Sequence, residues 1–182
     1  MTGGLGNQMF QYALYLKLKS MGKNVKMDDK TEYVLSNARP LMLWVFGIEY
    51  PKATDEEINK ITDGFLCFSH RVRRKIFGRK SMEYKEETCN FDKRILEIDT
   101  AYLTGYFQTQ KYFADIKEDV RKAFRFQPVI RQDLDAGITQ KIDAYQKAID
   151  DCLAISIHIR RGDYLENSAV FGDICTPEYY ES

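Results

Sequence analysis

The chain opens with MTGGLGNQMFQYALYL, residues 1–16, in which a cluster of glycines stands directly before an apolar segment. Glycine is entropically costly in regular structure, so such a cluster predicts a loop that bends sharply or lets another group approach its backbone. A loop of this kind in front of a helix is a candidate anion site, because free N–H groups and the positive end of the helix dipole point outward there. The glycines are Gly3, Gly4 and Gly6.

The segment after the glycines has the pattern of an amphipathic helix. Apolar residues recur at spacings of three and four from Phe10 to Met21, and this spacing places them on one helix face. Gly22 is expected to end the helix, since glycine is the usual residue at that C-terminal position.

The loop itself admits more than one interpretation. GLGNQ, residues 4–8, lacks the third glycine of the dinucleotide fingerprint G-x-G-x-x-G, and no Gly-Lys-Ser/Thr follows to make a P-loop. Asp28 or Asp29 lies about where a ribose-binding acid would sit, which keeps a nucleotide cofactor as an alternative. A second alternative is that the loop is a tight turn that only begins the helix and binds nothing. The amides of Asn7 and Gln8 donate and accept hydrogen bonds at once, which favours sugar hydroxyls or a diphosphate as the ligand.

Composition and charge narrow the classes of function. The chain has 182 residues, enough for one domain or one and a fraction. Its 27 Lys and Arg residues balance 27 Asp and Glu residues, so no overall field draws it to nucleic acid or to an anionic membrane. The longest apolar run, at 41–48, is too short to span a membrane, and no signal peptide is recognised. The sequence therefore predicts a cytoplasmic protein.

The cysteines form no C-x-x-C pair, and the chain has only two histidines. This spacing disfavours a zinc site. Buried free thiols in a reducing compartment are the expectation for Cys67, Cys89, Cys152 and Cys175.

Helical and strand patterns alternate along the rest of the chain. A short strand is indicated at 25–27, and a capping box at Thr54 opens a helix. The basic stretch 69–80 is expected to be a solvated face or loop. The alternative is that it binds an acidic ligand or a membrane surface. The remaining expected elements are a strand at 101–107, helices at 108–124 and 133–149, and a strand at 152–159 buried on both faces. This alternation favours an α/β architecture with a parallel sheet. The strand after Asp150 is a candidate for a second sheet, so a domain is expected at 1–150 and the start of a second at 151–182.

SIHIRRGDYL, residues 156–165, is the second stretch that carries chemistry. His158 and Arg160 share strand parity, and ligands of open α/β sheets bind outside the carboxyl ends of strands. The planar guanidinium groups of Arg160 and Arg161 match phosphate oxygens bidentately. Asp163 can hold the loop in shape by accepting backbone N–H groups or by pairing with an arginine. A surface turn with an Arg–Asp pair and an RGD adhesion tripeptide are the alternatives.

Three segments of the sequence resemble the bacterial α-1,2-fucosyltransferases, glycosyltransferase family eleven. GGLGNQMFQYA at 3–13 matches the N-terminal signature of that family nearly letter for letter, and GYFQTQKYF at 105–113 is similar to its middle segment. HIRRGDY at 158–164 carries the H-x-R-R-G-D motif that the family shares with α-1,6- and protein O-fucosyltransferases. The combination is highly specific and is spread over the whole chain.

The resemblance implies a GT-B-like fold, in which two Rossmann-type α/β domains with parallel sheets face a cleft. It implies GDP-β-L-fucose as donor, no metal and no cofactor, and inverting transfer to the 2-hydroxyl of a terminal galactoside on a glycan or glycolipid in surface-glycan or O-antigen synthesis. Arg160 would contact the donor diphosphate. The residues that would line the cleft from the N-terminal domain are Gly4, Gly6, Asn7 and Gln8. A peripheral contact with the inner membrane is a further expectation.

The sequence departs from the family pattern in two ways. The first strand expected before Thr2 is absent, and the chain stops at CTPEYYES, residues 175–182, where the family continues. The donor domain is therefore expected to be incomplete and the chain to be a fragment, with an inactive and an active fragment both left open by the sequence.

The expected chemistry separates charge between the sugar ring and the departing diphosphate. Without a metal, cationic side chains must stabilise the leaving phosphate. Arg160 is the first candidate and Arg161 the second, with a structural pair as the alternative for Arg161. His158 is expected to bond to fucose or phosphate, or else to serve packing. Asp163 is a candidate general base, although loop support is favoured for it.

Acceptor contacts are expected from the middle segment, at Tyr106 and Gln108, with sheet packing as the alternative for both. Three other functions stay open: a fucosyltransferase of other linkage such as α-1,6, a non-catalytic nucleotide- or glycan-binding module, and an NAD-type oxidoreductase. The GGLGNQ signature argues against the α-1,6 linkage, and the missing third glycine argues against the oxidoreductase.

Overall fold

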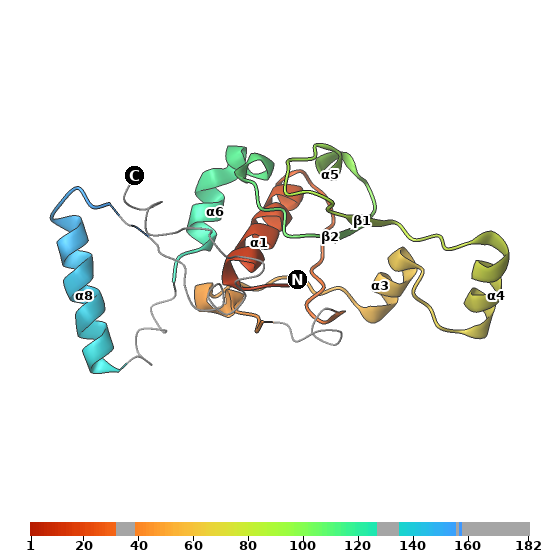
Figure 1. The fold of residues 1–182 in the computed structure, drawn as a ribbon, viewed down its shortest axis with the longest axis horizontal. Helices are drawn as coiled ribbons and strands as arrows, with labels where there is room; N and C mark the ends of the chain where they lie inside the picture. Colours follow the sequence, from red (N-terminus) through yellow and green to blue (C-terminus); the bar gives the residue numbers. More distant parts are fainter. Residues whose placement is uncertain (32–38, 127–134, 156, 158–182) are drawn as a thin grey trace, which may run out of the picture. The chain divides into compact units, whose positions relative to one another are not determined.

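The computed structural model describes residues 1–31, 39–126, 135–155 and 157 (Figure 1). The chain divides into two compact units, at 1–132 and 133–182. The sequence places a domain boundary later, between 150 and 151, and that boundary stays a prediction.

Helix α1, Leu5–Ser20, is the central element of the first unit (Figure 1). It begins after Gly4 and ends where the Gly22 N–H donates to the Lys19 carbonyl, with Gly22 at φ +79°. The left-handed backbone at Gly22 closes the last turn without the steric cost that a β-carbon would add. The predicted helix and its glycine stop are confirmed.

Two clusters of buried side chains pack against different faces of α1. In the first, Tyr12 and Tyr15 pack against the 3-10 turn η1, Leu43–Phe46, and against Met27. In the second, Leu14 and Leu18 pack with Ile95, Phe107 and Tyr112. Because α1 buries side chains on two faces, it lies inside the unit, and Figure 1 shows it between the sheet and α6.

The sheet has two parallel strands, β1 at Glu83–Lys85 and β2 at Tyr102–Thr104. A separate parallel bridge joins Met27 to Lys52. The strand predicted at 101–107 is thus confirmed over three residues, while the strand indicated at 25–27 forms a single bridge. Helices together with a small parallel sheet are consistent with an α/β fold.

Two helices follow one another between the Met27–Lys52 bridge and β1. Helix α3, Asp55–Thr62, begins with the predicted capping box: Thr54 Oγ1 accepts the Glu57 N–H, and Glu57 accepts the Thr54 N–H. Helix α4, Phe68–Phe77, occupies the basic stretch that was expected to be a solvated face or loop. A short helix, α5 at Arg94–Glu97, precedes β2.

The continuous helix predicted at 108–124 is wrong in its first half. That half forms two 3-10 turns, η2 at Gln110–Tyr112 and η3 at Ala114–Ile116, and only α6 at Lys117–Ala123 is α-helical. The Tyr112 ring is buried, and its hydroxyl accepts the Asp92 N–H at 3.0 Å. This tertiary contact, with Phe113 at φ −137°, outweighs the local helical pattern.

The described part of the second unit contains helix α8, Ala136–Asp150, which the sequence predicts. Its N-cap is Asp135, whose carboxylate accepts the Gly137 N–H at 2.8 Å. The strand predicted at 152–159 is wrong for the described residues 152–155 and 157, which form no strand. Their large apolar side chains are exposed, with Leu153 at 98%.

The described cysteines carry free thiols, but the expectation of burial is wrong for them. All three are exposed, because they lie at a helix start, in a loop and just after a helix end: Cys67, Cys89 and Cys152. Cys175 lies outside the described residues.

Candidate functional site

The glycine loop bends tightly over the start of α1. Gly3 has φ +79°, and a β-carbon there would lie 2.3 Å from Nδ2 of Asn7, so only glycine fits. At Gly4 and Gly6 an added β-carbon would meet no atom within 4 Å. Open space therefore borders the first turn of α1, where the sequence predicts that another group approaches the backbone.

The first turn of α1 offers unpaired hydrogen-bond donors. No side chain caps Gly4, the N-cap residue, and no acidic residue stands in the first turn. The first N–H groups of a helix have no partner within it, and the helix dipole adds positive potential there. Within the described residues, the loop thus has the electrostatic character of an anion site.

Among the predicted site residues that the structure describes, Gln8 is buried and hydrogen-bonded within the protein. Its side chain is fully buried, and Nε2 donates to the carbonyls of Gly3 and Pro40 at 2.9 Å each. Oε1 accepts the Met42 N–H at 2.8 Å. These three bonds tie the glycine loop to the 40–42 segment, so Gln8 sets the shape of the loop. Direct contact between Gln8 and a substrate stays a prediction.

Asn7 and Gln108 lie in contact, although 101 positions separate them in the chain. Gln108 Nε2 donates to Asn7 Oδ1 at 2.6 Å, and the pair is exposed. This bond brings the GGLGNQ segment and the GYFQTQKYF segment together beside the start of α1. Two of the three segments singled out in the sequence therefore form one surface.

The loop that carries Tyr106 is held by Glu86, a residue that the sequence analysis did not find. The backbone N–H groups of Tyr106 and Phe107 donate to Glu86 Oε2 at 2.8 and 2.9 Å. A β-carbon on Gly105 would lie 2.5 Å from Cβ of Glu86, and Phe107 has φ +53°. The clamp leaves the Tyr106 side chain exposed.

A signal for Glu86 exists in the sequence. Glu86 follows β1 directly, as the GYFQ loop follows β2. Since carboxyl ends of parallel strands meet at one edge of a sheet, the two segments had to lie side by side once the strands were recognised as neighbours. Glu86 Oε1 is buried and has no hydrogen-bond partner.

Asp28 and Asp29, the candidate ribose-binding acids, both have protein partners. Asp28 accepts hydrogen bonds from the Tyr102 hydroxyl at 2.6 Å and from the N–H groups of Lys30 and Thr31 at 3.0 Å each. Partial burial alone would raise the pKa of Asp28, but these bonds outweigh it and lower the pKa to about 2. The buried carboxylate of Asp29 pairs with Lys52 at 2.8 Å.

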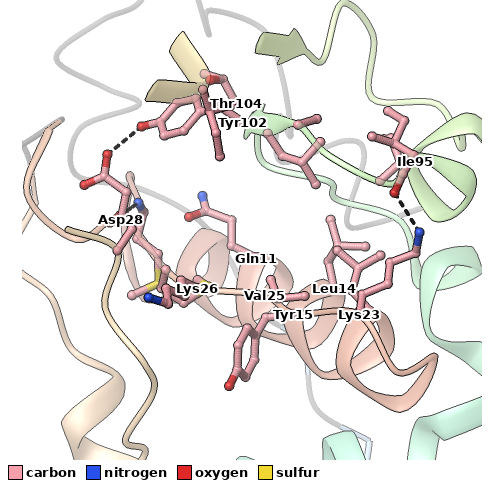
Figure 2. Close-up of a pocket in the computed structure, with 18 of the residues that line it drawn as sticks. Gln11, Leu14, Tyr15, Lys23, Val25, Lys26, Asp28, Ile95, Tyr102 and Thr104 are labelled. Atoms are coloured by element: carbon pink, nitrogen blue, oxygen red, sulfur yellow. Dashed lines mark hydrogen bonds between the residues drawn. The ribbon is translucent and has the colours of Figure 1, made fainter. Parts of the chain in front are cut away.

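A cavity of about 330 Å³ opens on another part of α1 (Figure 2). It lies between the 23–28 segment and the 101–105 segment, with Leu14 and Leu18 of α1 among its lining residues. Of the residues that the sequence singles out as candidate site residues, Asp28 lines it, and those of the GGLGNQ segment, Tyr106 and Gln108 do not. The cavity thus lies apart from Asn7 and Gln108, and its lining combines aliphatic side chains with polar and charged ones such as Gln11, Lys26 and Asp28.

Other predicted site residues lie outside the described residues, and their placement stays a prediction. They are His158, Arg160, Arg161 and Asp163. In the part of the chain that is described, no cluster of three or more His, Cys, Asp or Glu side chains could hold a metal ion. No helix there is long and apolar enough to cross a membrane.

Comparison with known proteins finds three relatives. The chain is 28% identical to an alpha-1,2-colitosyltransferase and 28% identical to the O-antigen biosynthesis glycosyltransferase WbnK, both of Escherichia coli, over 99% and 100% of its length. It is 25% identical to galactoside alpha-(1,2)-fucosyltransferase 1 of Rattus norvegicus over 90% of its length. These names support a glycosyltransferase of the fucosyltransferase type, but at this identity they do not establish the exact family.

The chain spans 60% and 64% of the lengths of the two Escherichia coli relatives and 37% of the rat relative. No family model matches the chain, and no solved structure matches it.

Proposed function

We propose that this protein is an inverting, metal-independent glycosyltransferase with a GT-B-like fold, which moves L-fucose from GDP-fucose to the 2-hydroxyl of a terminal galactoside. Surface-glycan or O-antigen synthesis is the proposed setting. The observation that carries the proposal is the contact between Asn7 and Gln108 beside the open first turn of α1. It unites two of the segments that resemble α-1,2-fucosyltransferases, and each of the relatives found transfers a sugar.

The glycine loop supplies the chemistry that a nucleotide diphosphate requires. Free N–H groups and the helix dipole attract an anion, and an acidic residue in the first turn would have repelled it. The space beside Gly4 and Gly6 lets a ligand reach the backbone. The Asn7 amide adds donors and acceptors that match sugar hydroxyls.

The proposed transition state carries positive charge on the fucose ring and negative charge on the leaving diphosphate. Arg160 would neutralise the diphosphate, with Arg161 as a second cation and His158 as a hydrogen-bond donor to phosphate or sugar. Asp163 would hold that loop or take the proton of the acceptor hydroxyl. Tyr106 and Gln108 would contact the acceptor from the middle segment, where Glu86 fixes the loop.

One relative favours a second donor. It is named a colitosyltransferase, and colitose differs from L-fucose only in lacking a hydroxyl group. A site that hydrogen-bonds that hydroxyl rejects the deoxy sugar strongly, whereas an apolar site does not. Comparison of the two GDP-sugars therefore distinguishes the donors.

The test is a binding and transfer experiment on the 182-residue chain. GDP is titrated by calorimetry, and the chain is incubated with GDP-fucose and lactose without added metal. The proposal expects GDP binding that Arg160→Ala weakens and that Arg121→Ala leaves unchanged, since Arg121 pairs with Glu118 on the surface of α6. In any chain that turns over, Arg160→Ala should lower the transfer rate on the order of 100-fold.

The outcomes separate the alternatives. Binding of GDP without transfer would indicate a non-catalytic nucleotide-binding module, and a 6-linked product would indicate the other linkage. Absence of GDP binding, or equal binding by Arg160→Ala, would refute the proposed donor site. Tight binding of NAD would favour the oxidoreductase.

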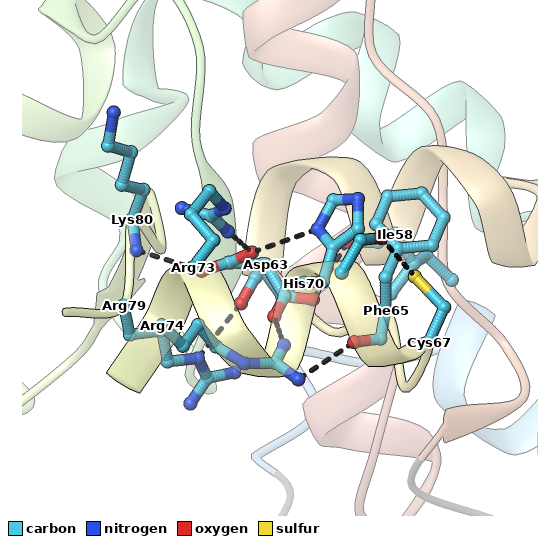
Figure 3. Close-up of polar contacts among 11 residues, drawn as sticks. Ile58, Asp63, Phe65, Cys67, His70, Arg73, Arg74, Arg79 and Lys80 are labelled. Carbon is cyan, nitrogen blue, oxygen red and sulfur yellow. Dashed lines mark hydrogen bonds and ion pairs between the residues drawn. The ribbon is translucent and has the colours of Figure 1, made fainter. Parts of the chain in front are cut away.

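We also propose that the protein acts in the cytoplasm and touches the inner membrane peripherally through α4. Two arginines of α4 turn toward the 63–65 segment (Figure 3): Arg73 binds the buried Asp63 carboxylate, and Arg74 donates to the carbonyls of Asp63 and Phe65. Asp63 also accepts the Lys80 N–H at 3.0 Å, and this bond and the charge of Arg73 lower the pKa of Asp63.

As a result, the apolar face of α4 points to solvent. Phe68, Val72 and Ile76 recur every four residues, and Phe68 and Ile76 are 81% and 66% exposed. The 64–82 segment holds six Lys or Arg residues and no Asp or Glu. Exposed apolar side chains flanked by cations fit an anionic lipid surface, into which the apolar side chains insert.

A further inference from the structure

A second pocket, the Trp44 pocket, lies beside the 3-10 turn η1. Its volume is about 490 Å³, which is within the range of pockets that take small molecules. The residues that line it come from the 41–44 segment, from the 48–52 segment and from Asp29. All of them belong to the first compact unit, so the fold of that unit alone forms the pocket.

The packing of its neighbours turns the Trp44 side chain outward. Leu43, Val45 and Phe46 are buried in the first of the two side-chain clusters. A 3-10 helix has three residues per turn, so burial of these three residues of η1 leaves the fourth on the solvent side. Trp44 is accordingly 63% exposed while it lines the pocket. The pocket therefore presents an aromatic ring to a ligand.

The polar part of the pocket is built around Asp29. The Met27–Lys52 bridge holds the 48–52 segment beside this residue. The Tyr50 hydroxyl donates to Asp29 Oδ2 at 3.3 Å, and Lys52 Nζ lies 2.8 Å from the same oxygen. The Asp29 side chain is only 5% exposed, whereas that of Lys52 is 63% exposed. A buried carboxylate thus fixes the position of an ammonium group, which has three N–H donors in all.

The side chains of the pocket suit an uncharged ligand with many hydroxyl groups. The carboxylates of Asp29 and Glu49 outnumber the single ammonium group of Lys52, so the pocket does not attract a diphosphate. The flat, apolar face of an indole packs well against the C–H face of a sugar ring, because the ring face carries partial negative charge. Carboxylates accept hydrogen bonds from sugar hydroxyls, and an ammonium group donates to them.

Gln8 connects the Trp44 pocket to the glycine loop. Its side chain, which also binds the loop, donates to the Pro40 carbonyl and accepts the Met42 N–H. Leu41, between these two residues, lines the pocket. Trp44 follows Met42 by two positions, which is a chain distance of at most about 7 Å. The pocket therefore adjoins the segment that Gln8 ties to the glycine loop.

From this arrangement we propose that the Trp44 pocket is a glycan subsite, in which the indole ring stacks on a sugar that does not itself receive fucose. The terminal galactose of the acceptor lies at the glycine loop, and the next sugar lies over Trp44. Glu49 and Lys52 bind hydroxyl groups of this second sugar. The inference rests on the proposed function, because it assigns a binding site to a further part of the proposed glycan acceptor.

The fluorescence of Trp44 tests the subsite directly, because this residue is the only tryptophan of the chain. Lactose, methyl β-galactoside and choline are titrated into the protein. Lactose has a second sugar ring and methyl β-galactoside has none, while choline is a cation that an aromatic ring beside carboxylates could also bind. Lactose should shift the emission of Trp44 to shorter wavelength and bind about tenfold more tightly than methyl β-galactoside.

Variants assign the binding to the pocket. Trp44→Ala should weaken lactose binding by about tenfold and leave the melting temperature and GDP binding unchanged, because the side chain is exposed. Ligand-observed NMR titrations measure lactose binding to this variant, which has no tryptophan. Tyr145→Ala is the matched control, since Tyr145 is an aromatic residue of α8 that is 70% exposed. Glu49→Gln should change lactose affinity by less than about threefold, because an amide still accepts hydrogen bonds.

Equal lactose affinity in the parent protein and Trp44→Ala would overturn the inference, and so would equal affinity for lactose and methyl β-galactoside. Tighter binding of choline than of lactose, lost in Glu49→Gln, would overturn it in favour of a cation pocket.

A GDP titration keeps this inference separate from the proposed function. GDP binding without lactose binding that depends on Trp44 would refute the glycan subsite alone. Lactose binding that depends on Trp44, in a protein that does not bind GDP, would refute the proposed donor site alone.

Discussion

Gln108 donates a 2.6 Å hydrogen bond to Asn7 across 101 positions of the chain, and this bond joins the loop after β2 to the first turn of α1. The bond is exposed to solvent, so it adds little to the stability of the fold. Its role is to hold the Asn7 amide in place beside the open glycine loop.

A double-mutant cycle tests this positional role. Asn7→Ala and Gln108→Ala should each weaken GDP binding by about tenfold and change the free energy of unfolding by less than about 1 kcal/mol. The double variant should lose less than the sum of the two single losses, because the second substitution removes a group whose partner is already gone. Calorimetric GDP titrations and urea unfolding measure the two effects. Strict additivity in binding would show that the two amides act separately.

Glycine substitutions in the loop should separate folding from binding. Gly6→Ala should stabilise the fold by about 0.5–1 kcal/mol, because Gly6 lies in α1 with open space around its α-carbon. The same methyl group should weaken GDP binding by blocking the approach to the backbone. Urea unfolding and GDP titration are compared with the parent chain, and unchanged GDP affinity would contradict the proposed approach.

Gly3→Ala is the contrasting substitution. It should destabilise the fold by more than about 1 kcal/mol, because Gly3 has φ +79° and its new methyl group would overlap the Asn7 side chain. The measurement is again urea unfolding. A stability equal to that of Gly6→Ala would show that the loop does not hold this conformation.

Removal of the charge on Glu86 should loosen the Tyr106 loop. Glu86→Gln replaces an oxygen that accepts two N–H groups, and the loss should be about 1–3 kcal/mol of unfolding free energy. Glu97→Gln is the matched control, since Glu97 makes an exposed ion pair with Lys93. Hydrogen exchange should become faster at Tyr106 and Phe107 in Glu86→Gln alone. Equal exchange in the two variants would mean that the clamp is not formed.

Stability should depend on Asp28 at acidic pH. Its folded pKa of about 2 lies below its ordinary value of 3.8, so its contribution is present above pH 4 and is lost as the pH falls from about 4 to about 2. Since Asp28 is partly exposed, the contribution is about 1 kcal/mol after solvent screening. Tyr102→Phe removes one of the bonds that lower the pKa. The acid-induced loss of unfolding free energy, followed by circular dichroism, should therefore be smaller in Tyr102→Phe.

Vesicle binding tests the outward face of α4. Phe68→Ser with Ile76→Ser should reduce sedimentation with vesicles that contain phosphatidylglycerol by about tenfold or more, because two apolar anchors are lost. Ile138→Ser with Ile149→Ser on α8 is the matched control, since these side chains are also exposed. Loss of binding in the control alone, or equal binding by neutral vesicles, would contradict the proposed membrane contact.

The sequence by itself determined the elements whose signals are local. The start of α1 after the glycines, its stop at Gly22, the capping box at Thr54 and the helix α8 all follow from patterns within a few residues. Such patterns fix backbone conformation because caps, turns and helical periodicity act over one or two turns. Of these local signals, the glycine loop before α1 also carries part of the resemblance to fucosyltransferases.

Only the tertiary structure decided the contacts between distant segments. Tyr112 is buried against Asp92 and breaks the helix that its own neighbourhood favours. Glu86 accepts a backbone N–H group of a loop twenty positions away. The Gln8 amide donates to the carbonyls of Gly3 and Pro40 and is therefore bound within the protein. The physical reason is that burial and long-range hydrogen bonds depend on which segments pack together, and local periodicity does not encode that choice.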